Sequence, residues 1–230
     1  MCPRSSPVRA VVFDLDDTLY RERDYARSGF RAVGEALRRR LGTAAGYEAW
    51  MWRRFAAGRR VDMFDALSRR FRLHLTARQI AELVRLYRRH RPEIRPCRGV
   101  PDLLRALRRR RRRVGLLSDG FLPAQQLKLD ALALEPLLDA VMFTERLGRG
   151  AWKPSKRGFQ AIRRALGKPH AACAYVADNP AKDFLAPNEL GWLTVQWRRP
   201  GQVHAGRPAP PGGAPQRVVR SGPELLAVLG

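Results

Sequence analysis

Apolar positions along this chain follow two different patterns, which divide it into three stretches. Residues 8–13 form a short run that is apolar except for Arg9, and similar apolar runs recur after residue 92. Such runs, bounded by polar residues, are typical of strands that are buried on both faces. Between residues 24 and 91 the apolar side chains instead recur three or four positions apart, which is the spacing of one helix face. The chain therefore predicts a helical stretch placed between two stretches that contain strands.

The stretch from 24 to 91 predicts a small bundle of about four helices. A late helix in it begins behind Thr76 and Gln79, which match the capping box that closes the start of a helix. Two shorter helical patterns, residues 47–55 and 62–71, precede it. The apolar faces of the first and last helices consist of Phe30, Val33, Leu37 and Leu41, and of Ile80, Leu83, Val84 and Tyr87.

From Pro92 onward, helical patterns alternate with short apolar runs. Such alternation indicates an α/β fold with a doubly wound parallel sheet. We therefore expect residues 1–20 and 92–230 to form an α/β core, and residues 21–91 to form an inserted helical domain. The Pro- and Gly-rich residues 200–215 indicate a loop or a mobile connection. Strands are predicted at 114–117, 140–143, 174–177, 192–197 and 218–219, with helices from Pro101, across Phe159, Ile162 and Leu166, and over 223–229.

The chain is strongly basic, with 45 basic and 21 acidic residues among 230 and a formal net charge of +24. Clustered cations bind nucleic acids by releasing counterions from phosphates. However, 40 of the 45 are arginine in a chain also rich in Ala, Gly and Pro, a bias that a GC-rich coding sequence would produce. The arginine run 108–113 ends a predicted helix, where cations complement the helix dipole, and no aromatic residues are interleaved with it for stacking. Nucleic-acid binding is thus the less favoured interpretation, although the charge would attract small anions.

Cysteine usage and hydropathy bear on the compartment. Cys2, Cys97 and Cys173 are widely spaced and form no CxxC pattern, so neither a disulfide framework nor a zinc site is expected. The first residues lack the apolar stretch of a secretory signal, and no segment has the apolar length needed to cross a bilayer. We therefore expect a soluble, cytoplasmic protein with reduced thiols and no membrane partner.

Asp14 and Asp16 lie two residues apart directly after the first predicted strand. Because side chains alternate across a strand, these two can share a side only if the chain leaves the sheet and turns there. Ligands bind at the carboxyl ends of strands in open parallel sheets, and two close carboxylates attract a hard cation such as Mg²⁺. A surface turn is the plain alternative, since Asp favours turns. This short motif alone is compatible both with a surface turn and with a metal-assisted reaction on an anionic substrate.

Further residues that phosphoryl transfer can use follow later predicted strands or lie on loops between elements. Ser118 and Asp119 follow the run 114–117, Lys153 lies on a loop, and Asp178 and Asp183 follow the run 174–177. With the first motif, the stretches DLDDTLY, LLSDG, WKP and ADNPAKD resemble the four motifs of the haloacid dehalogenase-like hydrolase superfamily, phosphatase branch. The resemblance spans nearly the whole chain. It implies a Rossmann-like core and identifies residues 21–91 with the superfamily's helical cap of the C1 type.

The resemblance implies catalysis through an aspartyl-phosphate intermediate. Asp14 would be the nucleophile that attacks phosphorus. Asp16 would protonate the leaving oxygen and later accept a proton from the attacking water. Mg²⁺ would be held by Asp14, Asp178 and the backbone carbonyl of Asp16. An Asp at position 16 also argues against the superfamily's dehalogenases, whose halide leaving group needs no proton.

The resemblance also assigns the groups that bind phosphate. Ser118 would donate a hydrogen bond to the phosphoryl group, aided by backbone N–H groups around Asp119. Lys153 would neutralise charge on both Asp14 and the phosphate, as a compact ammonium suits a phosphate. The plain alternative for residues 118–120 is a Ser-Asp-Gly turn.

Two more residues would support the catalytic and metal-binding side chains without contacting the substrate. Thr18 belongs to the first motif, and Asp183 would orient ligands or pair with Lys153. Asp183 has a plain alternative as a first-turn acid of a helix that begins near Pro180, where it would suit the helix dipole. Its neighbour Lys182 is expected on the surface.

The expected substrate is a small phosphorylated metabolite, such as a sugar phosphate or a nucleoside monophosphate, because a C1 cap would enclose the cavity. A phosphomutase of the same superfamily and a nucleic-acid-binding protein on this fold remain as alternatives. Aromatic residues at helical spacing are more often core than substrate platform. Within the cap, the candidates for substrate contact are Tyr25, Trp50, Trp52, Arg53, Arg54, Arg59 and Arg60.

Overall fold

The chain forms two compact units in the computed structural model, which describes residues 8–43 and 45–230. The first unit comprises Met1–Glu22 and Arg95–Gly230, and the second comprises Arg23–Ile94. The expected insertion, residues 21–91, therefore differs from the second unit by two residues at its start and by three at its end.

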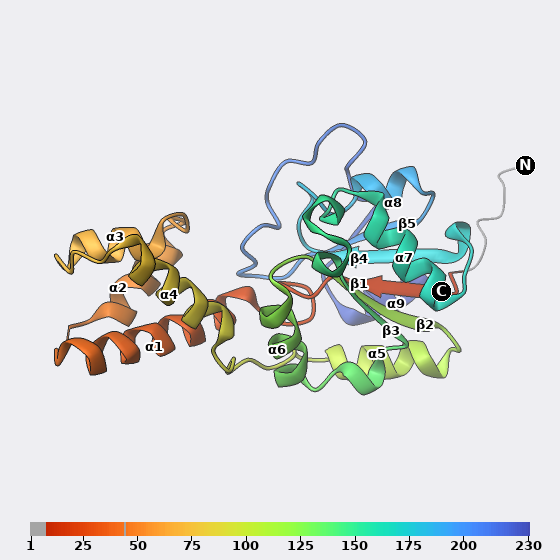
Figure 1. The fold of residues 1–230 in the computed structure, drawn as a ribbon. Coiled ribbons are helices and arrows are strands. Elements are labelled where there is room, and N and C mark those ends of the chain that lie inside the picture. Colours follow the sequence, from red (N-terminus) through yellow and green to blue (C-terminus); the bar gives the residue numbers. More distant parts are fainter. Residues whose placement is uncertain (1–7, 44) are drawn as a thin grey trace, which may run out of the picture. The chain divides into compact units, whose positions relative to one another are not determined.

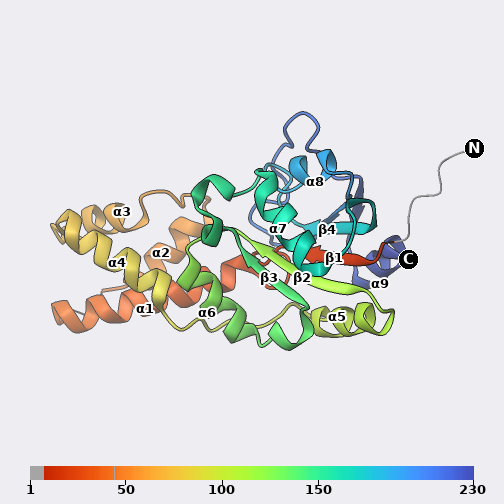
Figure 2. The same ribbon diagram turned by 45° about the vertical axis from the view of Figure 1, so that its right-hand side comes forward.

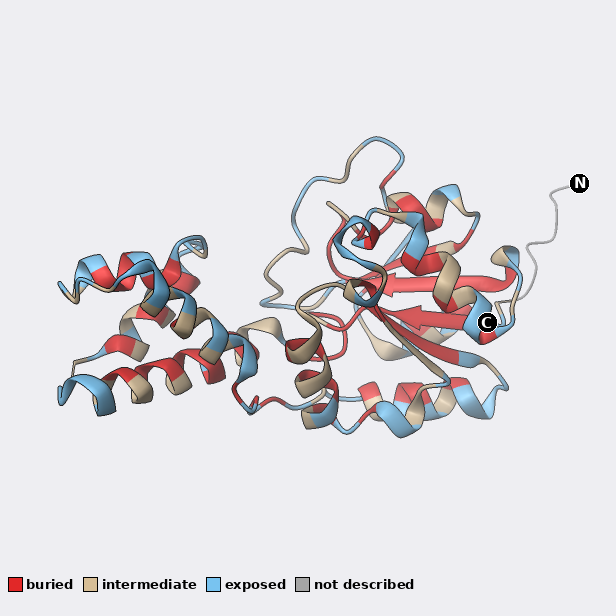
Figure 3. Ribbon diagram, viewed as in Figure 1, coloured by how far each residue is buried: buried red, intermediate tan, exposed pale blue. Residues whose placement is uncertain are grey.

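A six-stranded sheet forms the centre of the first unit, in the order β3-β2-β1-β4-β5-β6. Every neighbouring pair of strands runs parallel, as Figure 1 shows. All residues of β1 and β4 are buried, which is why their sequences are continuously apolar (Figure 3). The predicted α/β fold with a parallel sheet is confirmed. The strands are β1 (Ala10–Phe13), β2 (Arg113–Ser118), β3 (Ala140–Phe143), β4 (Cys173–Ala177), β5 (Leu193–Trp197) and β6 (Arg217–Val219).

Helices cover both faces of this sheet, with α7 and α8 on one face and α5 on the other (Figures 1 and 2). Leu166 and Ile162 of α7 pack onto β2 at Gly115, where an added Cβ would lie only 3.1 Å from Leu166 Cδ1. A glycine in mid-strand thus lets α7 approach the sheet closely. The helices of this unit are α5 (Val100–Arg109), α6 (Leu122–Leu132), α7 (Lys156–Leu166), α8 (Leu185–Glu189) and α9 (Gly222–Leu229).

Helix α6 was absent from the elements predicted by the sequence pattern. Its buried face includes the polar residues Gln125 and Lys128 beside Ala124 and Leu129. A helix that buries polar side chains shows no continuous apolar stripe, so periodicity alone does not reveal it. The reason for burying these polar groups lies in the site that they face.

The second unit is helical, with α1 (Glu22–Leu41) entering it from the first unit. Phe30 stacks against Tyr87 and meets Phe55 edge-on, with ring centroids 5.6 and 5.9 Å apart. Leu41, expected on the apolar face, is 37% exposed because it is the last residue of α1. The predicted capping box of Thr76 and Gln79 is confirmed. The other helices of this unit are α2 (Tyr47–Ala56), α3 (Met63–Arg70) and α4 (Ala77–Arg89).

The two places where the chain leaves and re-enters the first unit lie side by side. Tyr20 and Pro96 form an antiparallel β-bridge. Next to it, the Cys97 N–H donates to the Leu19 carbonyl at 2.9 Å. The first unit is therefore closed at this point by its own backbone hydrogen bond.

The segment between β5 and β6 contains no helix or strand, in agreement with the predicted loop at residues 200–215. It is nevertheless tied to the sheet. Gln202 Nε2 donates to the carbonyls of Asp17 and Trp197 at 2.7 and 2.8 Å. Among the described residues, every helix is too short or too polar to span a bilayer.

Candidate active site

The four motifs meet at the carboxyl edge of the parallel sheet. Phe13 of β1 pairs with Leu116 of β2 and Val176 of β4, so the residues that follow these strands emerge side by side. Asp14, Ser118 and Asp178 are the side chains brought together in this way, and each is at most 3% exposed. The ends of these strands therefore converge, as the sequence pattern predicted.

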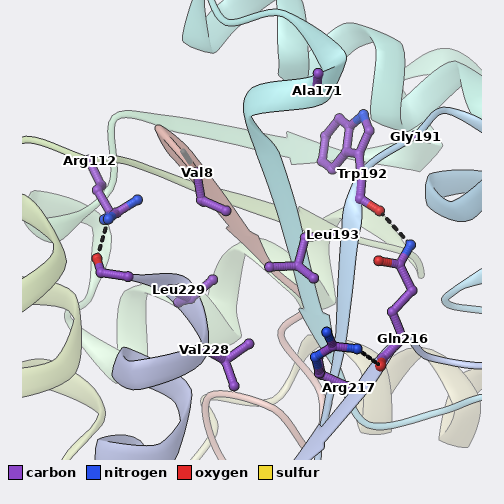
Figure 4. Close-up of a pocket in the computed structure, with 11 residues that line it drawn as sticks. Val8, Arg112, Ala171, Gly191, Trp192, Leu193, Gln216, Arg217, Val228 and Leu229 are labelled. Carbon is purple, nitrogen blue, oxygen red and sulfur yellow. Dashed lines mark hydrogen bonds between the residues drawn. The ribbon is translucent and has the colours of Figure 1, made fainter. Parts of the chain in front are cut away.

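A separate hollow lies at the opposite edge of the sheet. This cavity, of about 450 Å³, is lined by Val8, Trp192 and Leu229 among others, with Arg112 and Arg217 beside them (Figure 4). Val8 precedes β1, whereas Asp14 follows it, so the cavity is not the place where the motifs meet.

A tight turn after β1 carries the second aspartate. Leu19 N–H donates to the Leu15 carbonyl at 3.0 Å, and Asp17 adopts a left-handed conformation with φ of 52°. The Asp17 carboxylate holds this turn by accepting the N–H groups of Glu22 and Val203, at 2.8 and 2.6 Å. The chain thus turns where the spacing of Asp14 and Asp16 required it to. Asp17 stands in the motif, but the sequence analysis gave it no role.

Lys153 is the cation at the centre of the site. Its side chain has no exposed surface, and its Nζ lies 2.6 Å from Asp14 Oδ1 and 2.7 Å from Asp183 Oδ1. Nζ also donates to the Tyr175 hydroxyl at 2.9 Å. Burial alone would lower the pKa of Lys153, but Asp14 and Asp183 raise it well above its ordinary value. Lys153 is therefore held as an ammonium against the predicted nucleophile.

Asp14, Asp178 and Asp183 form a buried carboxylate cluster, with one ligand oxygen from each lying within 4.8 Å of the others. Burial raises the pKa of Asp14 to about 6, despite the opposing charge of Lys153. Burial, followed by the charges of Asp183 and Asp14, raises the pKa of Asp178 well above its ordinary range. Crowded carboxyls of this kind are stabilised in their charged form by a cation.

The oxygens of this cluster differ in what they contact. Asp183 Oδ2 accepts the N–H of Asn179 at 3.1 Å, and its Oδ1 faces Lys153, so both of its oxygens are engaged. Asp178 Oδ2 is buried and accepts no hydrogen bond from any described residue. A divalent cation that prefers oxygen ligands therefore fits Asp14 and Asp178, with Asp183 holding Lys153 and the 179–183 turn.

The plain alternative for Asp183, a helix that begins near Pro180, is not what the structure shows. Helix α8 begins at Leu185, so Asp183 precedes it and is no first-turn acid. Instead, the Asp183 side chain closes the turn that begins at Asn179. Lys182 is also less peripheral than expected, because its half-exposed side chain brings Nζ to 3.6 Å from Asp119 Oδ2.

The second motif supplies a hydroxyl and a shaped loop. Ser118 is 1% exposed and lies at the end of β2. The Asp119 carboxylate accepts the Thr144 hydroxyl at 2.7 Å and the Lys153 N–H at 3.2 Å, so this side chain fixes the loop that carries Lys153. Backbone N–H groups, rather than the Asp119 carboxylate, are suited to a phosphate here.

Thr18 is completely buried. It was expected to support the site, but only its backbone makes a hydrogen bond there. Its hydroxyl forms no hydrogen bond with any described group, whereas its carbonyl accepts Arg199 Nη1 at 2.6 Å.

Asp16 is surrounded by donors that the sequence analysis did not identify. Lys128 Nζ lies 2.7 Å from Oδ1, the Tyr20 hydroxyl donates to the same oxygen, and Gln125 Nε2 donates to Oδ2 at 3.0 Å. Burial would raise the pKa of Asp16, but the charge and hydrogen bond of Lys128, with the bonds from Tyr20 and Gln125, lower it. One signal could have revealed Lys128: it is one of only five lysines in a chain with 40 arginines.

Known proteins are similar to this chain over most of its length. A family model described as haloacid dehalogenase-like hydrolase matches residues 8–191. A glyceraldehyde 3-phosphate phosphatase of Methanopyrus kandleri is 29% identical over 201 residues, 84% of each chain. A phosphatase of Mycobacterium tuberculosis is 31% identical over 186 residues, 74% of this chain and 79% of its own.

A solved structure shows the same fold. The HAD-hydrolase YfnB from Bacillus subtilis, bound to magnesium, superposes with a TM-score of 0.72 over 98% of this chain and 100% of its own, at 20% identity. The matched family region contains all four motifs together with the buried residues Asp14, Lys153 and Asp178. This protein therefore belongs to the haloacid dehalogenase-like hydrolase family.

Proposed function

We propose that this protein is a Mg²⁺-dependent phosphatase that hydrolyses a small phosphate monoester through an aspartyl-phosphate intermediate. One observation carries the proposal: the buried carboxyl of Asp14 faces the Lys153 ammonium at 2.6 Å and shares an oxygen cluster with Asp178. Such a site combines a nucleophile, a charge that neutralises phosphate and ligands for a hard cation.

Asp14 would attack phosphorus with a carboxylate oxygen while the ester oxygen departs. Lys153 and the Ser118 hydroxyl, with backbone N–H groups of residues 119 and 120, would hold the phosphoryl oxygens as charge builds on them. Asp14 and Asp178, with the backbone carbonyl of Asp16, would hold Mg²⁺, which when bound supplies charge neutralisation at the phosphoryl group.

Asp16 would give a proton to the leaving oxygen and take one from the water that hydrolyses the intermediate. A halide leaves without a proton, so the presence of a carboxyl at position 16 supports a phosphatase over a dehalogenase. The hydrogen bonds that Asp16 accepts favour its carboxylate, the form that can accept a proton from water.

We further propose that residues 21–91 act as a cap of the C1 type that closes over the leaving group and sets the substrate class. The relative named glyceraldehyde 3-phosphate phosphatase supports a small phosphorylated metabolite as substrate, with sugar phosphates as the first class to test and nucleoside monophosphates as the second. The protein's localisation is proposed to be cytoplasmic.

The test is a phosphate-release screen over small phosphate esters, with and without Mg²⁺. We expect release that requires Mg²⁺ and falls by at least ~10³-fold in Asp14→Asn, because the amide is no nucleophile. Asp102→Asn is the matched control, since Asp102 is an exposed aspartate of α5 whose carboxylate pairs with Arg105 of the same helix.

Other outcomes separate the alternatives. A phosphomutase would return the phosphoryl group to its intermediate and release little phosphate in plain water. A nucleic-acid-binding protein would bind DNA or RNA in a salt-sensitive way, equally well with Asp14→Asn. Either result, without phosphate release from the wild type, would contradict the proposal.

A further inference from the structure

Helix α6 turns two buried polar side chains toward Asp16. Gln125 and Lys128 are 3% and 7% exposed, and a spacing of three residues places them on the same side of the helix. Burying a lysine is unfavourable unless its charge is paired and hydrogen-bonded. Lys128 pairs with Asp16, with its Nζ 2.7 Å from Oδ1.

Both oxygens of Asp16 are held in this way. Lys128 Nζ and the Tyr20 hydroxyl donate to Oδ1, while Gln125 Nε2 donates to Oδ2 at 3.0 Å. Gln125 Nε2 also donates to the Asp119 carbonyl, which ties Asp16 to the loop of the second motif. The carboxyl is therefore fixed in position and in rotation, although its side chain is still 23% exposed toward the site.

A stability role explains this arrangement poorly. A buried ion pair contributes little more than well-packed apolar residues of the same volume would. Lys153 already supplies the cation that faces Asp14 at 2.6 Å, so a second buried lysine is not needed for that task. Three donors to one carboxyl instead restrict the direction in which its two oxygens point.

We propose that Lys128 and Gln125 are positioning residues that hold the Asp16 carboxyl in a fixed orientation for the second half of the reaction. This inference rests on the proposed phosphatase function. In that step a water oxygen bonds to phosphorus, and the bond from phosphorus to Asp14 breaks, returning its electron pair to the Asp14 carboxylate. The water proton goes to Asp16, and inorganic phosphate is released. Asp16 then carries the proton that the next leaving oxygen receives.

The test uses the full chain, Mg²⁺ and p-nitrophenyl phosphate. Nitrophenolate leaves without needing a proton, so forming the intermediate should depend little on Asp16, whereas its hydrolysis requires a base. In Lys128→Met we expect kcat to fall by ~10- to ~100-fold, less than the ~10²- to ~10⁴-fold effect of a general base itself because Lys128 acts through Asp16, while kcat/KM stays within about threefold. Rapid mixing should show a burst of about one nitrophenol per enzyme, because the aspartyl-phosphate accumulates.

Two further variants complete the design. Gln125→Met should show the same burst with a smaller loss of kcat, and it carries the test if Lys128→Met fails to fold. Lys156→Met is the matched control, because Lys156 lies half-exposed on α7 and pairs with Glu189. We expect this control to have wild-type kinetics without a burst.

A parallel loss of kcat and kcat/KM without a burst would overturn the positioning role, because it would indicate damage to phosphate binding or to the fold. An unchanged kcat in a folded Lys128→Met would overturn it as well. If the wild type releases no phosphate from any ester with Mg²⁺, the phosphatase proposal itself is wrong.

Discussion

At the scale of single residues, the site depends on how one buried cation balances several buried carboxyls. Lys153 contacts Asp14 and Asp183 at 2.6 and 2.7 Å, yet burial still raises the pKa of Asp14 to about 6. One lysine therefore does not compensate the whole cluster. A divalent cation would supply the missing charge and convert a repulsive cluster into a ligand set.

This balance predicts how stability depends on pH and Mg²⁺. The folded pKa of Asp14 is raised from 3.8 to about 6, so the folded protein binds more protons than the unfolded chain between these values. Protonation of Asp14 should therefore stabilise the metal-free folded state as the pH falls from about 6 toward 3.8. Above about pH 6, Mg²⁺ should stabilise the folded state instead. At saturating Mg²⁺ we expect Tm to rise on the order of 5 °C at pH 7.5 and by much less at pH 5, because protons compete with the metal.

Differential scanning calorimetry at both pH values would measure this, with Asp178→Asn as the comparison. That variant should lose the Mg²⁺ response at pH 7.5. A Tm rise that is equal at both pH values, or that persists in Asp178→Asn, would show that Mg²⁺ binds elsewhere.

At the scale of elements, strands were easier to predict than helices with polar inner faces. The run Ala140–Phe143 was predicted with its observed bounds because all four of its residues are apolar, although three of them are only partly buried in this edge strand. Helix α6 was missed because Gln125 and Lys128 lie on its buried face. The start of α8 was also misplaced, since Pro180 opens a turn held by Asp183 and not a helix.

The same distinction explains which site residues the sequence could indicate. Residues directly after strands, such as Asp14 and Asp178, follow from the pattern because parallel strand ends converge. Tyr175 and Lys128 lie within elements, where a polar residue carries no sign of the direction in which it points. Only tertiary packing brings Tyr175 to 2.9 Å from Lys153.

The loop between β2 and α6 should be sensitive to a single methyl group. Gly120 has φ of 128°, a region that side chains rarely adopt, and an added Cβ would lie 2.5 Å from Gln125 Nε2. We expect Gly120→Ala to lower the free energy of unfolding by about 1–3 kcal/mol and to reduce phosphate release. Urea denaturation would measure the change. Gly150→Ala is the control, because nothing lies within 4 Å of its Cβ position. An equal loss of stability in both variants would contradict a specific effect at Gly120.

At the scale of the whole molecule, the chain leaves the first unit after Glu22 and returns to it at Arg95. The bridge between Tyr20 and Pro96 brings the two crossing segments together within the first unit. The strand order of that unit contains no residue from the second. Its core therefore does not need residues 23–94 to complete the sheet.

We predict that a short Gly/Ser linker in place of residues 23–94 leaves a folded first unit. Mg²⁺-dependent hydrolysis of p-nitrophenyl phosphate should remain measurable, while preference among natural esters should be lost, because a cap would provide that preference. Circular dichroism melting and the ester screen would check both parts. A shortened protein that does not fold, or one that keeps full selectivity, would contradict the proposed division of roles.

Several arginines of the run 108–113 bind groups within the molecule. Arg110 Nη1 and Arg108 Nη1 donate to the carbonyls of Leu226 and Pro136, at 3.2 and 2.8 Å. Arg113 pairs with Asp139 at 2.8 Å. Part of the arginine run thus fastens neighbouring segments, which weakens its interpretation as a surface for nucleic acids.

The scarcity of lysine has a practical consequence for chemical probing. The Lys128 side chain is 8% exposed and the Lys153 side chain is fully buried, whereas the Lys156 side chain is about half-exposed. Acylating reagents that attack primary amines should therefore modify Lys156 readily and the two interior amines slowly. Peptide mass mapping would measure the acylation rate of Lys128 and of Lys153 separately. Each rate would report how often that amine becomes exposed to solvent.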